Sequence, residues 1–328
     1  MRLELDIVAT RGDMIESRHH VHAVVVDDTG ALRASAGDPA IPTVLRSCAK
    51  PFQALPFVAS GGLDGLHWSD EMLALSCASH GGEPEHVAIA SRMLASIGLE
   101  EGDLACGPHD PLTRRGQKAL KDADENATRL HNNCSGKHAA MLAFAKTQNW
   151  PTRGYEQCVH PVQQAVIECL AEWTELPAPS LRLMTDGCGV VAFGLPMQRF
   201  AFALAKLGAA AHRGDATPKR VLGAMRAHPF LVGGTDRFDT VLIEETHGRA
   251  IAKIGAEGVH AVTIPERGLA AVVKVEDGAF RAQHPAVIRL LQYLDVLPAE
   301  LSPRLAAFLR TPIVNTRGAT VGEIRPVA

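Results

Sequence analysis

A serine and a lysine three residues apart stand in the stretch "RSCAKPFQALP", residues 46–56. Positions i and i+3 share one face of a helix, so the amine of Lys50 can approach the hydroxyl of Ser47. A serine attacks a carbonyl only after a base accepts its proton, and a lysine becomes such a base when its pKa is lowered. The alternative is a helix-capping serine followed by a solvated lysine. A choice between the two needs further residues.

A second serine and a second lysine occur beside glycines. Ser79 lies in "SCASHGGEPEH" (76–86), and Lys253 opens "KIGAEG" (253–258). Alone, these stretches are typical of a glycine-rich connection between helices and of an ordinary strand followed by a turn. Two serines, two lysines and glycines that permit close backbone approach together predict hydrolysis through a serine.

Two cysteines raise the question of a metal. Cys134 lies in "HNNCSGKHAAM" (131–141) and Cys188 in "MTDGCGVVAFGLP" (184–196). Two thiolates with added nitrogen or oxygen donors can hold Zn²⁺. A reactive thiolate at a helix N-terminus, or two packed core cysteines, are the alternatives. His20 and His22 also alternate on one expected strand, where a hydrogen-bonded or solvent-facing pair is favoured over a metal site.

The elements that must position these residues follow from the apolar pattern. Residues 22–36 predict a strand, a turn and a second strand, and further strands are expected at 250–255, 259–264 and 269–278. A helix is expected at about 285–295. Helical patterns fill the middle of the chain, with Ser69 as an N-cap and one helix at 83–99 that ends near Gly98.

This order predicts an α+β fold with one antiparallel sheet built from both ends of the chain. We expect one discontinuous unit over residues 1–328, with the sheet from about 1–45 and 248–328 and a helical lobe at about 46–247. The chain contains no GxGxxG, GxxxxGK[ST] or HExxH pattern, so the common nucleotide-binding and zinc-protease motifs are excluded.

The composition is that of a globular protein. The 328 residues are 46% hydrophobic and 21% charged, and the formal net charge is -3 with a pI near 6.6. We therefore expect no nucleic-acid or membrane partner. The N-terminus does not resemble a signal peptide, and seven scattered cysteines argue against a disulfide framework. The expected location is the cytoplasm.

An ordered set of motifs resembles the rhizobial-type L-asparaginase II family, the class 3 L-asparaginases. The motifs run from about residue 9 to residue 280: "ATRGDMIESRH", "SCAKPFQALP", "SCASHGGEPEH", "CGPHDP", "HNNCSGKHAAML", "DGCG", "HPFLVGGTDRFDT" and "KIGAEG". The resemblance implies a fold similar to serine β-lactamases and penicillin-binding proteins. It also implies hydrolysis of L-asparagine to L-aspartate and ammonia by a homodimer.

The resemblance assigns residues as well. It implies two catalytic pairs, Ser47 with Lys50 and Ser79 with Lys253, and we favour Ser47 as the nucleophile. It implies a zinc ion held by the side chains of three residues and a water molecule, these residues being Cys134, Lys137 and Cys188. For the α-amino and α-carboxylate groups of the substrate we hypothesise a further set of contacts, namely Asn133, His138 and Asp186.

Other functions stay open at this stage. A glutaminase, a β-lactamase or an esterase could use the same serines and the same fold. A catalytically inactive binding protein for an amino acid or zinc would need neither lysine. An amidohydrolase that depends on Cys134 would instead be inactivated by a thiol-alkylating reagent.

Overall fold

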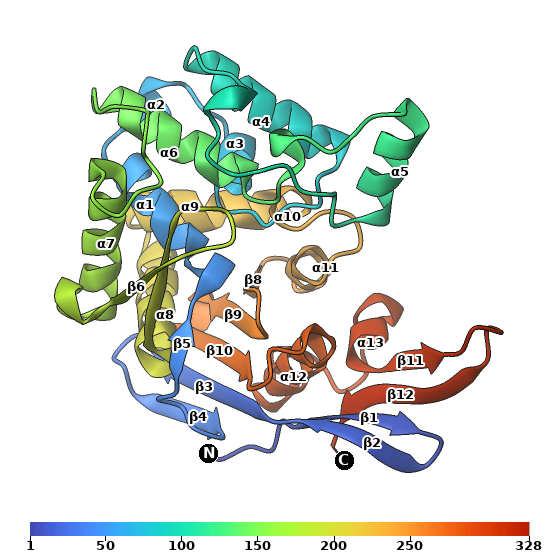
Figure 1. Cartoon of the computed structure of the whole chain (residues 1–328). Coiled ribbons are helices and arrows are strands. Elements are labelled where there is room, and N and C mark those ends of the chain that lie inside the picture. Colours follow the sequence, from blue (N-terminus) through green and yellow to red (C-terminus); the bar gives the residue numbers. More distant parts are fainter. Residues whose placement is uncertain (328) are drawn as a thin grey trace.

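The computed structural model describes residues 1–327, which form three antiparallel sheets and a helical lobe (Figure 1). The α+β class and the antiparallel pairing predicted from sequence are confirmed. Within this described part, every helix is too short or too polar to cross a membrane.

The central sheet has five strands from both ends of the chain. Its order is β4 (Leu32–Ala36), β3 (Val21–Asp27), β10 (Leu269–Val275), β9 (Val259–Ile264) and β8 (Ile251–Ile254). The helices α8 and α12 pack against these strands, and β9 is buried along its whole length. Both faces are covered, which explains the near-continuous apolar runs in the sequence.

The expectation of one sheet was wrong, because the two ends of the chain also form a second sheet. Its order is β11 (Thr311–Val314), β12 (Thr320–Pro326), β1 (Ile7–Arg11) and β2 (Met14–His19). A single residue, His20, separates β2 from β3, so the chain leaves one sheet and enters the next without a loop.

A third sheet lies in the region expected to be only helical. It contains β5 (Pro42–Val44), β7 (Val191–Pro196) and β6 (Arg182–Thr185). The turn between β6 and β7 carries "DGCG", so two hydrogen-bonded strands hold Asp186 and Cys188 in place.

The helices of the lobe follow the predicted pattern closely. Ser69 caps its helix by accepting a hydrogen bond from the backbone N–H of Met72. The helix expected at 285–295 begins earlier, at Phe280, and contains Pro285. The helices are α1 (Lys50–Ala59), α2 (Gly62–Gly65), α3 (Asp70–Ser76), α4 (Pro84–Ser96), α5 (Arg114–Ala123), α6 (Ser135–Thr147), α7 (Pro161–Thr174), α8 (Met197–Arg213), α9 (Ala216–Ala227), α10 (Pro229–Val232), α11 (Phe238–Glu245), α12 (Phe280–Tyr293) and α13 (Pro303–Leu309).

The helix α6 is the centre of the lobe. Its residues 135–145 are all buried, as expected for a helix surrounded by other elements. At Gly136 a Cβ atom would lie 2.4 Å from the carbonyl oxygen of Leu75, so α3 and α6 pack with almost no space between them. This contact places the first turn of α6, which carries Lys137, beside the end of α3.

Candidate functional site

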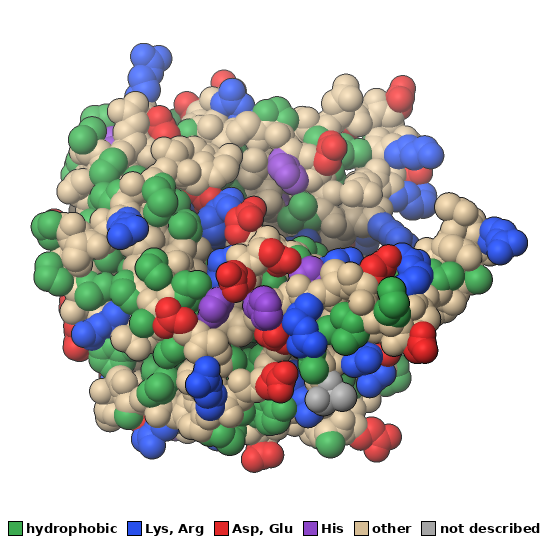
Figure 2. All heavy atoms as spheres, turned by 60° about the horizontal axis from the view of Figure 1, so that its bottom comes forward, with side chains coloured by type: hydrophobic (Ala, Val, Ile, Leu, Met, Phe, Trp, Pro, Cys, Tyr) green, Lys and Arg blue, Asp and Glu red, His purple; other side chains and the backbone are tan. Residues whose placement is uncertain are grey.

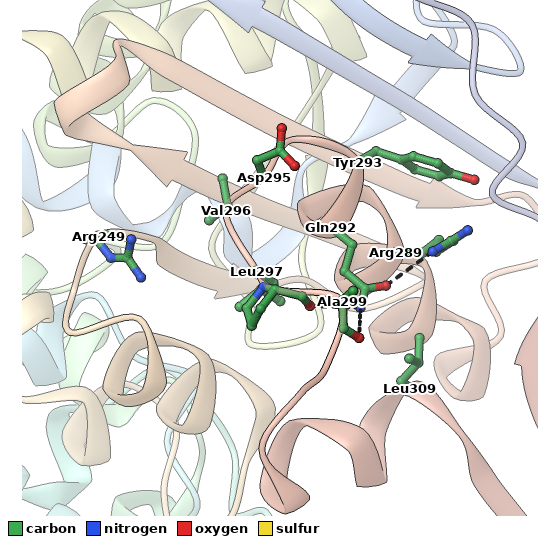
Figure 3. Close-up of a pocket in the computed structure, with 10 residues that line it drawn as sticks. Arg249, Arg289, Gln292, Tyr293, Asp295, Val296, Leu297, Ala299 and Leu309 are labelled. Atoms are coloured by element: carbon green, nitrogen blue, oxygen red, sulfur yellow. Dashed lines mark hydrogen bonds between the residues drawn. The ribbon is translucent and has the colours of Figure 1, made fainter.

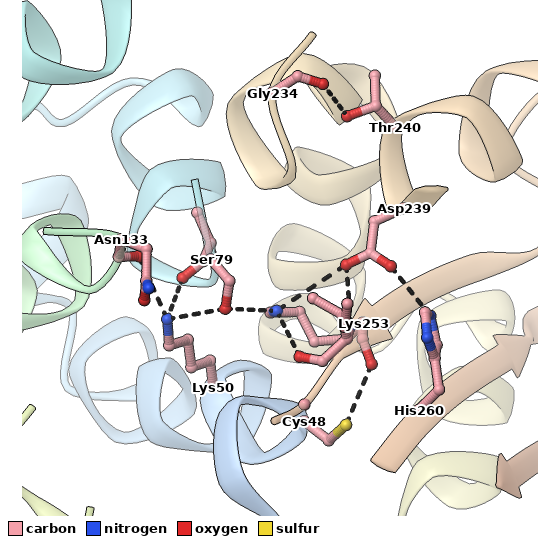
Figure 4. Close-up of polar contacts among 12 residues, drawn as sticks. Cys48, Lys50, Ser79, Asn133, Gly234, Asp239, Thr240, Lys253 and His260 are labelled. Atoms are coloured by element: carbon pink, nitrogen blue, oxygen red, sulfur yellow. Dashed lines mark hydrogen bonds and ion pairs between the residues drawn. The ribbon is translucent and has the colours of Figure 1, made fainter. Parts of the chain in front are cut away.

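Two lysine amines meet at one serine hydroxyl. The Nζ atom of Lys50 lies 3.1 Å from Ser79 Oγ, and the Nζ atom of Lys253 lies 2.9 Å from the same oxygen (Figure 4). Lys50 is only 1% exposed, Ser79 5% and Lys253 3%. Lys50 also donates to the backbone carbonyls of Ala78 and Asn133. We call these three residues the Lys50–Ser79–Lys253 cluster.

Three elements far apart in the sequence bring the cluster together. Lys50 is the first residue of α1, Ser79 follows α3, and Lys253 lies on the edge strand β8. The loop of Ser79 is held on two sides, because the N–H of Ser79 donates to Val232 and the N–H of His80 donates to Asn133. The predicted convergence of both lysines with Ser79 is therefore present in the structure.

The protonation state of the cluster depends on a buried carboxylate. Asp239, on the first turn of α11, lies 3.9 Å from Lys253 Nζ and 3.0 Å from His260 Nε2, and accepts a hydrogen bond from the N–H of Ile254. Burial would raise the pKa of Asp239, but His260 and Lys253 hold it below its ordinary value. Asp239 is therefore a carboxylate, and it partly compensates the two lysines.

Lys253 has the pKa of a usable base. Burial, assisted by the charge of Lys50, lowers the pKa of Lys253 to about 8, although Asp239 opposes the shift. A substantial fraction of this amine is thus uncharged close to neutral pH, which a proton acceptor requires.

Ser47 lies on a strained segment beside the cluster. It is half-buried in the short 3₁₀ helix Arg46–Ala49, and Arg46 has a positive φ of 48°, unusual for a residue with a side chain. Arg46 Nε donates to Asp186 at 2.7 Å, which holds this segment. Within residues 1–327 the Ser47 hydroxyl makes no hydrogen bond, and Lys50 contacts Ser79 instead.

The two cysteines and the lysine expected to bind zinc also lie together. Lys137 Nζ is 2.9 Å from Cys188 Sγ. Interaction with Cys134 lowers the pKa of Cys188 to about 4, while the same interaction and burial raise that of Cys134 to about 12. Both sulfurs raise the pKa of Lys137 despite its burial.

This donor set fits a zinc ion in part. Two sulfurs and one nitrogen are suitable ligands, and the lowered pKa of Cys188 favours its thiolate, but Lys137 must lose its proton before it can donate a lone pair. No group of three or more histidine, cysteine or acidic side chains suited to a metal occurs in the described part of the chain. A metal here would therefore depend on the lysine.

The expected substrate contacts lie at different depths. Asp186 borders Arg46, and Asn133 is half-buried, its Oδ1 accepting from the thiol of Cys134 at 3.0 Å. Burial would raise the pKa of Asp186, but Lys137 and Arg46 keep it low. His138 is fully buried, 2.6 Å from the hydroxyl of Tyr155 through Nδ1, and its Nε2 has no partner among residues 1–327.

Residues with a clear place in the site escaped the sequence analysis. Asp239 stands in the motif "HPFLVGGTDRFDT" and His260 in the strand expected at 259–264, but neither was given a role, and Arg46 was not considered. The signal for Asp239 was present, because its carboxylate stands in "RFDTVLI", a segment that is otherwise largely apolar. Charged groups in such segments are rarely buried without a partner.

The histidines of "RHHVH" are paired with carboxylates. His19 lies 2.6 Å from Asp277, His20 lies 2.9 Å from Asp6, and His22 lies 3.4 Å from Glu276. The favoured interpretation of a hydrogen-bonded group is therefore confirmed for His20. Figure 2 shows acidic and basic side chains interspersed over this side of the molecule, without a continuous patch of one charge.

A large cavity lies away from the cluster. It has a volume of ≈ 700 Å³ and is found at the end of α12, where Arg249, Arg289 and Tyr293 line it (Figure 3). None of the residues predicted to act in catalysis, substrate binding or metal binding lines it. Cavity size alone therefore does not identify the site.

Comparison with known proteins agrees with the motifs. The family model described as L-asparaginase II matches residues 7–326. The protein is thus an amidohydrolase. More specifically, the chain belongs to the L-asparaginase II family.

The curated proteins and the solved structures give no close relative among the matches described below. A search of curated proteins finds no significant match. Among solved structures, a β-lactamase from Mycobacterium bovis is 14% identical, with 85% of this chain and 96% of that chain covered and a TM-score of 0.40. A second, titled Mglu in its glutamate form, is also 14% identical, with coverage of 86% and 63% and a TM-score of 0.38. At this identity and TM-score, the similarity to these structures does not indicate what this chain does.

Proposed function

We propose that this protein hydrolyses L-asparagine to L-aspartate and ammonia through a serine nucleophile that is assisted by two lysines. Membership of the L-asparaginase II family supports the substrate. The observation that carries the mechanism is the pair of short contacts from Lys50 and Lys253 to Ser79 in a buried cluster. One hydroxyl between two amines forms a continuous route for a proton.

The reaction has two halves. Ser47 Oγ attacks the carbon of the side-chain amide while its proton passes to the Lys50–Ser79–Lys253 cluster. The C–N bond then breaks, ammonia leaves with a proton returned from the cluster, and an ester to Ser47 remains. Water attacks this ester, releasing L-aspartate and restoring the hydroxyl. Ser47 is the more accessible of the two serines and its hydroxyl is not committed to a hydrogen bond, which favours it as nucleophile.

The residues near Ser47 bind the α-ammonium and α-carboxylate groups of the substrate. We assign Asp186 to the α-ammonium group, because its carboxylate is charged. Asn133 supplies amide donors, and Arg46, already beside Asp186, offers a cation for the α-carboxylate. His138 supports this region from within the core.

Zinc is part of the proposal as a positioning element. Cys134, Lys137 and Cys188 would hold it, and a bound zinc ion supplies Lewis acidity and a rigid link between their two loops. The chain's own contribution is to hold Asp186 and Asn133 toward the substrate. Prolonged chelation should therefore raise KM more than it lowers kcat, and readded Zn²⁺ should restore KM. A fall in kcat at constant KM would contradict this role.

The test of the function is ammonia release with asparagine and glutamine as substrates. The native protein should act on asparagine and leave glutamine and a chromogenic β-lactam unchanged, whereas a glutaminase or β-lactamase would not. Ser47→Ala should lose at least about a thousandfold in kcat/KM. Mass spectrometry of the quenched reaction should find the acyl group on Ser47. An acyl group on Ser79 would overturn the assignment of the nucleophile.

We also propose that the protein is a cytoplasmic homodimer, as the family resemblance implies. Light scattering coupled to gel filtration would give the mass of the assembly, and a single 35.0 kDa species at all concentrations would refute the dimer. Fractionation of the source cells would test the location.

A further inference from the structure

A second cavity adjoins the far side of Asp239. It has a volume of ≈ 430 Å³, enough for a small ligand, and lies where the start of α11 meets α12, α13 and the strands β11 and β12. Asp239 and Ile254 line it, but neither serine of the proposed active site does. The cavity therefore lies apart from both serines and shares two residues, Asp239 and Ile254, with the surroundings of Lys253.

Four aromatic rings line part of its wall. The rings of Phe238 and His284 are stacked with centroids 4.5 Å apart, and Phe308 meets both edge-on at 5.2 and 5.4 Å. Phe280 packs edge-on against His284 and is 57% exposed. Such walls bind flat apolar groups, because rings prefer offset or edge-on neighbours at these distances.

One cation on the cavity wall has no partner. Within residues 1–327 the guanidinium group of Arg237 makes no hydrogen bond and no ion pair. Burial lowers its pKa, and the charges of Asp239 and Glu83 oppose this shift. Arg281, in contrast, donates to His19 and Ser17. A half-buried guanidinium group that lacks a partner attracts an anion, and its planar fork suits a carboxylate.

Neither acidic residue of the wall forms a direct ion pair with this cation among the described residues. Asp239 forms ion pairs with His260 and Lys253 and accepts a hydrogen bond from the N–H of Ile254. Asp236 is exposed to solvent at the rim, where water screens its charge. The wall thus combines apolar rings with one guanidinium group that forms no direct ion pair with either acidic residue of the wall.

We propose that this cavity binds a small amphipathic anion, a carboxylate with an aromatic body, whose ring packs against Phe238, Phe308 and His284 and whose carboxylate pairs with Arg237. L-asparagine does not match it, because asparagine lacks an apolar body. The proposal is independent of the proposed function, because it concerns binding alone.

The experiment compares one anion with one neutral analogue by isothermal titration calorimetry on the full-length protein. The probes are 4-phenylbutyrate and 4-phenyl-1-butanol, which differ in the charged group. We expect saturable binding of the carboxylate at least tenfold tighter than that of the alcohol. Arg237→Gln should remove this preference. Equal affinities, or no saturable binding of the carboxylate at millimolar concentration, would overturn the proposal.

A matched pair of variants tests the location. Ala307 lines the cavity, whereas Ala306 is exposed on the same helix and does not. Ala307→Phe should fill the space and abolish binding, while Ala306→Phe should bind as the native protein does. Thr311, on β11, also lines the cavity, so Thr311→Phe provides a second variant with a filled cavity if the first does not fold. Unchanged binding in a folded blocking variant, or competition by L-asparagine, would refute the site.

Discussion

At the scale of single residues, the charge on Lys253 decides how the site works. An amine accepts a proton only when it is uncharged, and the pKa of Lys253 is about 8. The value of kcat/KM should therefore rise with pH up to about this pKa and then level off. Asp239 raises the pKa by favouring the ammonium form, whereas burial and Lys50 lower it.

Replacing Asp239→Asn removes the carboxylate and keeps the shape of the side chain. The pKa of Lys253 should then fall, which moves the acidic limb of the kcat/KM profile to lower pH by about 1–2 units. The measurement is kcat/KM for asparagine between pH 5 and 10. Asp277→Asn, at a half-exposed carboxylate paired with His19, is the control and should leave the profile in place. An unmoved limb in Asp239→Asn would show that Lys253 does not govern the rate.

Sequence reasoning found most of these residues and the pairing of Ser79 with Lys253, but not the partner of Lys50. The rule for a helix face relates Lys50 to Ser47, its neighbour along the chain, whereas the contact that forms is with Ser79, 29 residues away. Asp239 was missed for a related reason. An acidic residue in the first turn of a helix is explained by the helix dipole alone, so the apolar residues around Asp239 indicate burial but do not identify its partners.

At the scale of elements, a buried glutamate joins the loop of Ser79 to the loop that leads into α11. Glu83 is 0% exposed and accepts hydrogen bonds from the N–H and the hydroxyl of Thr235 and from Arg115. Burial would raise the pKa of Glu83, but the hydrogen bonds from Thr235 and Arg115 outweigh it. This connection fixes the position of Asp239, four residues beyond Thr235, relative to Ser79.

We expect Glu83→Gln to reduce the free energy of unfolding by about 1.5–3 kcal/mol, because a buried carboxylate with charged and neutral donors is lost. Because the loop into α11 loosens, kcat should also fall. Glu85→Gln is a close control, since Glu85 pairs with the same Arg115 but is 46% exposed, and it should cost less than about 1 kcal/mol. Urea unfolding and steady-state kinetics on both variants would check this. Equal losses in the two variants would contradict a special role for Glu83.

Strands could be predicted from the sequence where their burial produces a clear run of apolar residues. The strands β9 and β10 are buried on both faces and appear as apolar runs, so their positions were anticipated. The sheet of β1, β2, β11 and β12 was not, because β2 and β11 are mostly exposed and show no clear alternation. Its existence depends on pairing across almost the whole chain, with Ile7 opposite Pro326.

At the scale of the whole molecule, the two ends of the chain and its middle depend on one another. Strands from the two ends of the chain pair with one another in two sheets, and α8, from the middle of the chain, packs against β3 and β10. Lys253 on the sheet must also meet Lys50 and Ser79 from the lobe for the cluster to exist. A lobe that unfolded separately would leave Lys253 on the sheet without the Ser79 hydroxyl that it contacts.

We therefore predict that sheet and lobe unfold in one transition. Trp68, Trp150 and Trp173 all lie in the lobe, so tryptophan fluorescence follows that part alone. Hydrogen exchange measured by mass spectrometry on peptides from β10 follows the sheet. Along a urea series the two signals should change at the same midpoint, because loss of either part exposes the apolar surface that covers the other. Exchange of β10 at urea concentrations where the fluorescence is still native would instead show that the sheet unfolds independently, and the cluster would then be an interface between two domains.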